Sequence, residues 1–109
     1  MQVQINTGHN IAGDEVAAAR MRTTVRDSLG RVGDSITRVE VHLSDRDGSA
    51  KTGVKEMRCM MEARLEGREP VAVTHSAATV DRAIDGAAAK LAKVIGRMHG
   101  RTRDRSTKP

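Results

Sequence analysis

Apolar and polar positions alternate in four segments of the chain, the pattern of β-strands with one buried face. In residues 1–6 a valine and an isoleucine alternate with glutamines, and a similar alternation runs through residues 36–44, 57–67 and 71–75. Because successive side chains of a strand point to opposite faces, these segments predict a sheet with one covered face and one face in water.

Between the first two strands, apolar residues recur three or four positions apart, which predicts an amphipathic helix. Asp14 is a residue type that caps helix N-termini, and Glu15 is favourable in a first turn. The stripe that would be buried contains Ala18, Met21, Val25, Leu29 and Val32. We therefore expect a helix that begins after Asp14 and extends to about Val32.

A second helix is predicted in the last third of the chain. It begins after Ser76 or Thr79 and extends to about Met98, and the glycine two positions later would end it. The remaining residues, 100–109, are basic and too polar to fold alone. We therefore divide the chain into one domain, residues 1–99, and a basic flexible tail.

The order of these elements is β-α-β-β-β-α, which predicts an α+β fold. A helix between the first two strands implies a parallel pair with a right-handed crossover, and the next two connections resemble hairpins. Both helices should pack on one face of the four-stranded sheet, since only that face offers apolar side chains. The predicted core consists of Val3, Ile5, Val25, Leu29, Val39, Val41, Leu43, Met61, Leu65, Val73, Ile84, Leu91 and Ile95.

The outer face of the predicted sheet carries both signs of charge. Its charged residues are Arg38, Arg58, Arg64, Glu40, Glu62 and Glu66. Opposite charges on neighbouring strands can pair, so we expect this face to be neutral overall.

The composition limits how the chain could bind a partner. A length of 109 residues allows one domain with one core. The chain has no Phe, Trp or Tyr, so it lacks the aromatic platforms on which proteins stack unpaired bases. A nucleic-acid partner would therefore be contacted through its backbone and shape.

The net charge of +5 lies entirely in the second half of the chain. Residues 1–54 carry seven basic and seven acidic side chains, whereas residues 55–109 carry twelve and seven. A localised excess of positive charge favours an anionic partner. The alternative is a solvated helix face with no partner.

Basic residues recur three or four positions apart on both predicted helices. They are Arg82, Lys90, Lys93 and Arg97 on the second helix and Arg22 and Arg26 on the first. If the helices lie side by side, we expect these residues to line the groove between them or its rim. Cations fixed on rigid elements suit phosphate groups, which need charge at set positions and no base readout.

The sequence gives little support to other chemistry. The single cysteine, Cys59, excludes an intrachain disulfide and suits a reducing compartment. The histidines lack the spacing of a metal site, and no nucleophile or acid–base pair is positioned. We expect no enzyme, metal, cofactor or small-molecule substrate. With no visible signal peptide or membrane-length apolar run, we expect a cytoplasmic protein that binds no membrane.

Two stretches resemble the ribosome hibernation promoting factor family, also called ribosome-associated inhibitors or ribosomal subunit interface proteins. The first is TGHNI, residues 7–11. The second is AIDGAAAKLAKVIGR, residues 83–97, which is similar to the family's closing helix, A-I-D-x-x-x-x-K-L-x-(R/K)-x-x-x-(K/R). Lys90, Lys93 and Arg97 stand at its three basic positions. With the order of elements, the resemblance covers residues 1 to about 99.

The resemblance implies a fold similar to a double-stranded-RNA-binding domain and a non-enzymatic role in ribosome hibernation. Members occupy the decoding channel of the small ribosomal subunit, contact its rRNA and inhibit translation in stationary phase or stress. The rRNA contacts would be led by Lys90, Lys93 and Arg97, with Arg22, Arg26, Arg82 and Arg101 in support. The family usually has a Met-Tyr or similar pair where Val80 and Asp81 stand here, and we expect Asp81 to weaken contact at that end.

Two alternatives remain open at this point. The chain could bind other structured RNA through the same basic residues. It could instead be a protein-interaction module that pairs through a sheet edge or the Met60 face. The sequence also leaves open whether the chain promotes ribosome pairing, alone or with a separate ribosome-pairing factor, or blocks single ribosomes.

Overall fold

The computed structural model describes residues 1–8, 15–45 and 56–107, with side chains as far as His99. The elements are β1 (Gln2–Thr7), α1 (Glu15–Leu29), the 3-10 helix η1 (Gly30–Ser35), β2 (Ile36–Asp45), β3 (Met57–Leu65), β4 (Val71–Ala77) and α2 (Val80–Thr107). The predicted order β-α-β-β-β-α is confirmed.

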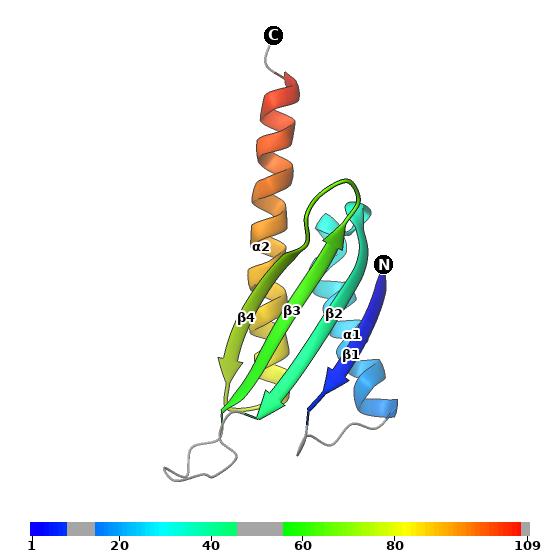
Figure 1. Ribbon diagram of the computed structural model, residues 1–109, viewed down its shortest axis with the longest axis vertical. Helices are drawn as coiled ribbons and strands as arrows, with labels where there is room; N and C mark the ends of the chain where they lie inside the picture. The colour runs from blue at the N-terminus through cyan, green and yellow to red at the C-terminus, as the bar shows by residue number, and fades with distance from the viewer. Residues whose placement is uncertain (9–14, 46–55, 108–109) are drawn as a thin grey trace.

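The strands form one sheet in the order β1-β2-β3-β4. The β1–β2 pair is parallel and the two following pairs are antiparallel, as the connections predicted. Both helices lie on the same face of the sheet, α1 beside β1 and β2 and α2 beside β3 and β4 (Figure 1). The turn between β3 and β4 contains Gly67, whose φ of 72° is readily adopted only by glycine.

The core lies between the sheet and the helices, and most of it was predicted correctly. Among the predicted core residues, only Val3, Ile5 and Val73, on the two edge strands, are half-buried. The core also contains Met21, Ile36, Cys59, Ala63, Ala83, Ala87 and Ala88. In a chain without aromatic residues, the small side chains of Ala83, Ala87 and Ala88 allow α2 to lie close against the sheet.

The outer sheet face is neutralised by ion pairs, as expected. Glu40 lies 3.4 Å from Arg38 and 3.8 Å from Arg64. Arg64 also lies 3.6 Å from Glu62 on its own strand. Surface pairs of this kind add little to stability, but the two arginines and two glutamates that form them carry no net charge together.

Both predicted helix ends need correction. The α-helix α1 ends at Leu29, and the chain continues through η1 in a tighter turn that keeps Val32 against the core. The second helix begins at Val80 and is capped by Thr79, whose hydroxyl accepts a hydrogen bond from the backbone N–H of Arg82 at 3.2 Å. It does not end at Gly100, and its backbone extends to Thr107, well past the end of the sheet (Figure 1).

Two further expectations can be placed only in part. The connection between β2 and β3, residues 46–55, and the loop of residues 9–14 lie outside the described residues. Among the described residues, no helix has the length and apolar character needed to cross a membrane.

Candidate nucleic-acid interface

Four basic residues form an exposed ridge along α2, here called the α2 ridge: Arg82, Lys90, Lys93 and Arg97. At 3.6 residues per turn their side chains fall within an arc of about 80°, and a rise of 1.5 Å per residue spreads them over about 22 Å. All four are exposed because the apolar stripe of Ile84, Leu91 and Ile95 occupies the opposite side of the helix. The ridge is therefore a line of cations fixed on a rigid element.

The α2 ridge lies on the side of α2 that faces β4. The ammonium of Lys90 donates a hydrogen bond to the backbone carbonyl of Thr74 in β4 at 2.9 Å. One turn earlier on the same flank, Gly86 packs directly against the imidazole of His75. Lys90 is thus held in place by an uncharged partner and not by a carboxylate.

Carboxylates are absent from the ridge within the part of the chain whose side chains are described. None of the four residues of the α2 ridge forms an ion pair with a described side chain. The acidic residues of α2 whose side chains are described, Asp81 and Asp85, project about 140–180° around the helix from Lys90. Among the described side chains, no carboxylate therefore compensates the positive charge of the ridge.

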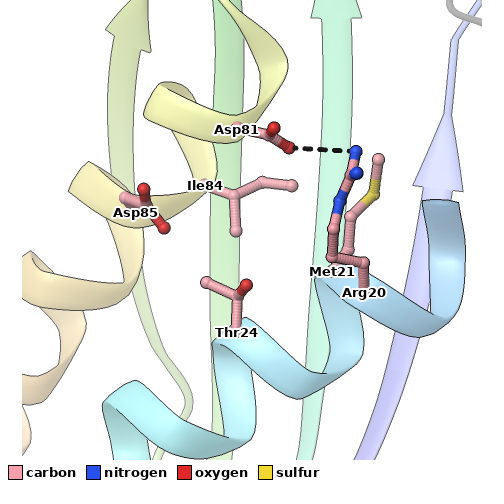
Figure 2. Close-up of a pocket in the computed structure, with 6 residues that line it drawn as sticks. All are labelled: Arg20, Met21, Thr24, Asp81, Ile84 and Asp85. Carbon is pink, nitrogen blue, oxygen red and sulfur yellow. Dashed lines mark ion pairs between the residues drawn. The ribbon is translucent and has the colours of Figure 1, made fainter.

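The prediction that basic residues line the groove between the two helices is wrong. The pocket at that position has a volume of about 180 Å³. Figure 2 shows its lining, which consists of Arg20, Met21, Thr24, Asp81, Ile84 and Asp85. None of the predicted basic residues lines it, because the flank of α2 that faces α1 carries Asp81 and Asp85. Asp81 pairs with Arg20 of α1 at 3.6 Å, so its charge is directed away from the ridge.

The predicted basic residues of α1 lie on the flank away from α2. Arg26 lines an open hollow of about 420 Å³ together with Arg38 and β1. Arg22 is half-buried and lies 3.9 Å from Glu15. The two sets of cations therefore occupy opposite sides of the helical layer instead of one shared groove.

Two other basic residues bear on the predicted site. The side chain of Arg101 lies outside the described residues, so its role stays a prediction. Arg20 was not predicted, although it is the basic residue of α1 that faces α2. Its partner Asp81 is far away in the sequence, so no local pattern marks the pair.

The structure places Cys59 opposite His75 in the β3–β4 register, the one cysteine–histidine juxtaposition in the described chain. Burial raises the pKa of the Cys59 thiol from 9.0 to about 12. The thiol is therefore protonated at neutral pH and is a poor nucleophile. Among the described residues, no cluster of histidine, cysteine or acidic side chains is arranged to hold a metal ion.

Comparison with known proteins identifies relatives of the whole fold. Residues 5–103 match the family model described as Sigma 54 modulation protein / S30EA ribosomal protein. No curated protein matches the chain.

Two solved structures share the fold. The Thermus thermophilus Protein Y N-terminal domain is 23% identical, with a TM-score of 0.67, and the match covers 90% of this chain and 99% of that chain. A ribosomal subunit interface protein from Coxiella burnetii is 14% identical, with a TM-score of 0.67, and the match covers 92% and 99% of the two chains. At these identities the structural likeness concerns the fold alone.

Proposed function

Because the chain belongs to the Sigma 54 modulation protein / S30EA ribosomal protein family, a family of ribosome-associated proteins that are not enzymes, we propose that it binds the small ribosomal subunit and inhibits translation. In this proposal the domain occupies the decoding channel in stationary phase or stress. It acts by occlusion in the cytoplasm, and it needs neither a cofactor nor a covalent step.

The observation that carries the proposal is the uncompensated charge of the α2 ridge. Its cations are exposed and fixed on one helix, and none of them pairs with a carboxylate among the described side chains. Phosphates are the anions that such a row suits, because lysine and arginine bind phosphate oxygens without reading base identity. The absence of aromatic residues fits the same kind of contact.

The position of the cations changes how rRNA would be contacted. The α2 ridge and the α1 pair, Arg22 and Arg26, lie on opposite sides of the helical layer. In the proposed complex the two sets bind separate stretches of rRNA, with the domain wedged between them. Such a wedge would fill a channel more effectively than a single groove holding one strand.

The proposal is tested by removing the charge of the α2 ridge. The triple variant Lys90→Ala, Lys93→Ala and Arg97→Ala should lose co-sedimentation with small subunits and keep its far-UV circular dichroism spectrum. A control with the same change in net charge is Arg31→Ala, Arg58→Ala and Arg68→Ala, which lie outside the ridge. The control should co-sediment like the unmodified chain. Unchanged co-sedimentation of the ridge variant would show that the wrong surface was chosen.

Salt dependence measures how many phosphates are contacted. If about five are contacted, log K should fall with log salt concentration at a slope of about −3.5 to −4.5. The ridge variant should have a slope shallower by about 2 to 3, since it lacks three of the contacts. A flat dependence for the unmodified chain would exclude phosphate binding.

A competition experiment separates the ribosome from other structured RNA. Binding to small subunits is measured with an excess of an arbitrary RNA duplex. We expect the subunits to retain the protein. Equal loss to the duplex would favour a general RNA-binding module.

A further inference from the structure

We propose that β1 is an open sheet edge at which two copies of the chain pair in antiparallel orientation, forming one continuous sheet. This inference concerns a surface other than the α2 ridge and does not depend on ribosome binding. It follows from a difference between the two edges of the sheet.

The two edges differ at one point: a lysine blocks one outward carbonyl of β4, whereas no described side chain is seen to block the outward groups of β1. At β4, the ammonium of Lys90 donates a hydrogen bond to the outward-pointing carbonyl of Thr74. A lysine at this position is a known protection against strand addition. Within residues 1–8, 15–45 and 56–107, no strand pairs with the outer side of β1. Its six residues include no charge and no proline, and its pairing with β2 has no bulge.

The backbone of β1 presents a specific set of groups at this edge. The N–H of Gly8 donates to the carbonyl of Leu43 in β2 at 2.9 Å, so it points inward to the sheet. Successive backbone groups of a strand point to opposite sides. The N–H and C=O groups of Val3, Ile5 and Thr7 therefore point outward, where a further strand would bind them.

The apolar side chains of β1 are incompletely covered. Val3 and Ile5 are half-buried, whereas their partners in β2, Val39 and Val41, have no exposed surface. A neighbouring strand with apolar residues on the same face would cover the remainder. The edge is therefore incomplete in both hydrogen bonding and burial.

A second copy of β1 fits this edge. A two-fold axis perpendicular to the sheet at Gln4 places Val3 opposite Ile5 of the partner subunit, and Ile5 opposite Val3 of the partner subunit. Both pairs lie on the covered face, and each exchanges its two outward N–H···O=C bonds. The same operation keeps all four helices on one side of the joined sheet, and such an interface is isologous.

The charges beside the edge also favour a second copy over an acidic peptide. Arg38 is already paired with Glu40 at 3.4 Å. Among the described residues lining the adjoining hollow, Arg26 is left as the uncompensated cation. A strand without charged residues needs no further cation at this edge. A single unpaired arginine is too little positive charge to favour an acidic segment. Because both copies carry Arg26, salt should strengthen the pairing, whereas it would weaken binding to RNA.

The pairing is tested by sedimentation equilibrium over micromolar to millimolar concentrations, since an interface this small should be weak. Interference optics are needed because the chain has no tyrosine or tryptophan, and absorbance at 260 nm then reports bound nucleic acid directly. Gln4→Lys should weaken the dimer about fivefold or more, because two like charges meet at the axis, beside the Arg38 guanidinium that donates a hydrogen bond to Gln4 in each chain. The matched control Ala72→Lys, exposed on β4, should leave dimerisation unchanged.

A charge swap gives the decisive result. Mixing the Gln4→Lys chain with a Gln4→Glu chain should restore a dimer, because opposite charges then face each other across the axis. Circular dichroism confirms that each variant folds. A monomer at every concentration, equal weakening by Ala72→Lys, or no recovery in the mixture would overturn the proposal. Association that requires material absorbing at 260 nm would assign the edge to RNA instead.

Discussion

Replacing Gly86 with alanine tests how closely α2 packs on β4. A Cβ atom at this position would lie 2.1 Å from Cδ2 and 2.2 Å from Nε2 of His75. Both distances are far below van der Waals contact, and the ring's Cγ is 2.6 Å away. The whole imidazole would therefore have to move, or α2 would have to shift from the sheet.

Two opposing effects set the expected size of the change. Overpacking of this kind costs about 1–3 kcal/mol. Alanine in a helix interior is more favourable than glycine by about 0.8–1.0 kcal/mol. We therefore expect Gly86→Ala to lower the free energy of unfolding by about 1 kcal/mol, which lowers Tm by about 4–8 °C in a domain of this size.

The sign of the effect should reverse when the imidazole is removed. In a His75→Ala background only the gain in helix propensity remains, so adding Gly86→Ala should stabilise the protein by about 1 kcal/mol. The assay is urea unfolding of the four proteins of the cycle, followed by far-UV circular dichroism because the chain has no fluorescent side chain. Stabilisation by Gly86→Ala in both backgrounds would refute the contact between Gly86 and His75.

Two further predictions follow from single side chains. Thr79→Ala should lower the free energy of unfolding by about 1 kcal/mol in the same assay, because the N–H of Arg82 loses its capping hydroxyl; no change would mean that the cap contributes nothing. Burial raises the pKa of Cys59 from 9.0 to about 12, so the fold binds this proton more tightly than the unfolded chain does. The resulting stability is complete below pH 9 and should fall by about 1.4 kcal/mol per pH unit as pH rises from 9 towards 12. This slope should be absent from Cys59→Ala in parallel titrations, and equal slopes in both proteins would contradict the prediction.

The layers of the fold were predictable because the side-chain periodicity determines which residues share a face. The alternation in β2 buries Val39, Val41 and Leu43. The three- and four-residue spacing in α2 buries Ile84, Leu91 and Ile95. Alternation was weaker evidence at the sheet edges, where Val3 and Val73 are only half-buried because no neighbouring strand covers them.

Helix ends were harder to predict because their signals are local and ambiguous. Val32 continues the apolar stripe of α1, yet the chain reaches it through a 3-10 turn that holds the same residue against the core. Gly100 looked like a terminator. A glycine ends a helix when the chain turns left-handed there; otherwise it is a helix residue that costs about 1 kcal/mol relative to alanine.

The side of α2 that carries the ridge depends on tertiary structure and not on the helix's own sequence. Periodicity gives the angle between Lys90 and Ile84, but it does not say which neighbour lies on each flank. Strand order supplies that information: β4 is an edge and α2 lies over β3 and β4, so one flank faces α1 and the other faces the open side of β4. Lys90 bonds to Thr74 on that second flank, and the same bond blocks one outward carbonyl of β4. The exposed ridge and the unprotected β1 edge are therefore two consequences of one strand order.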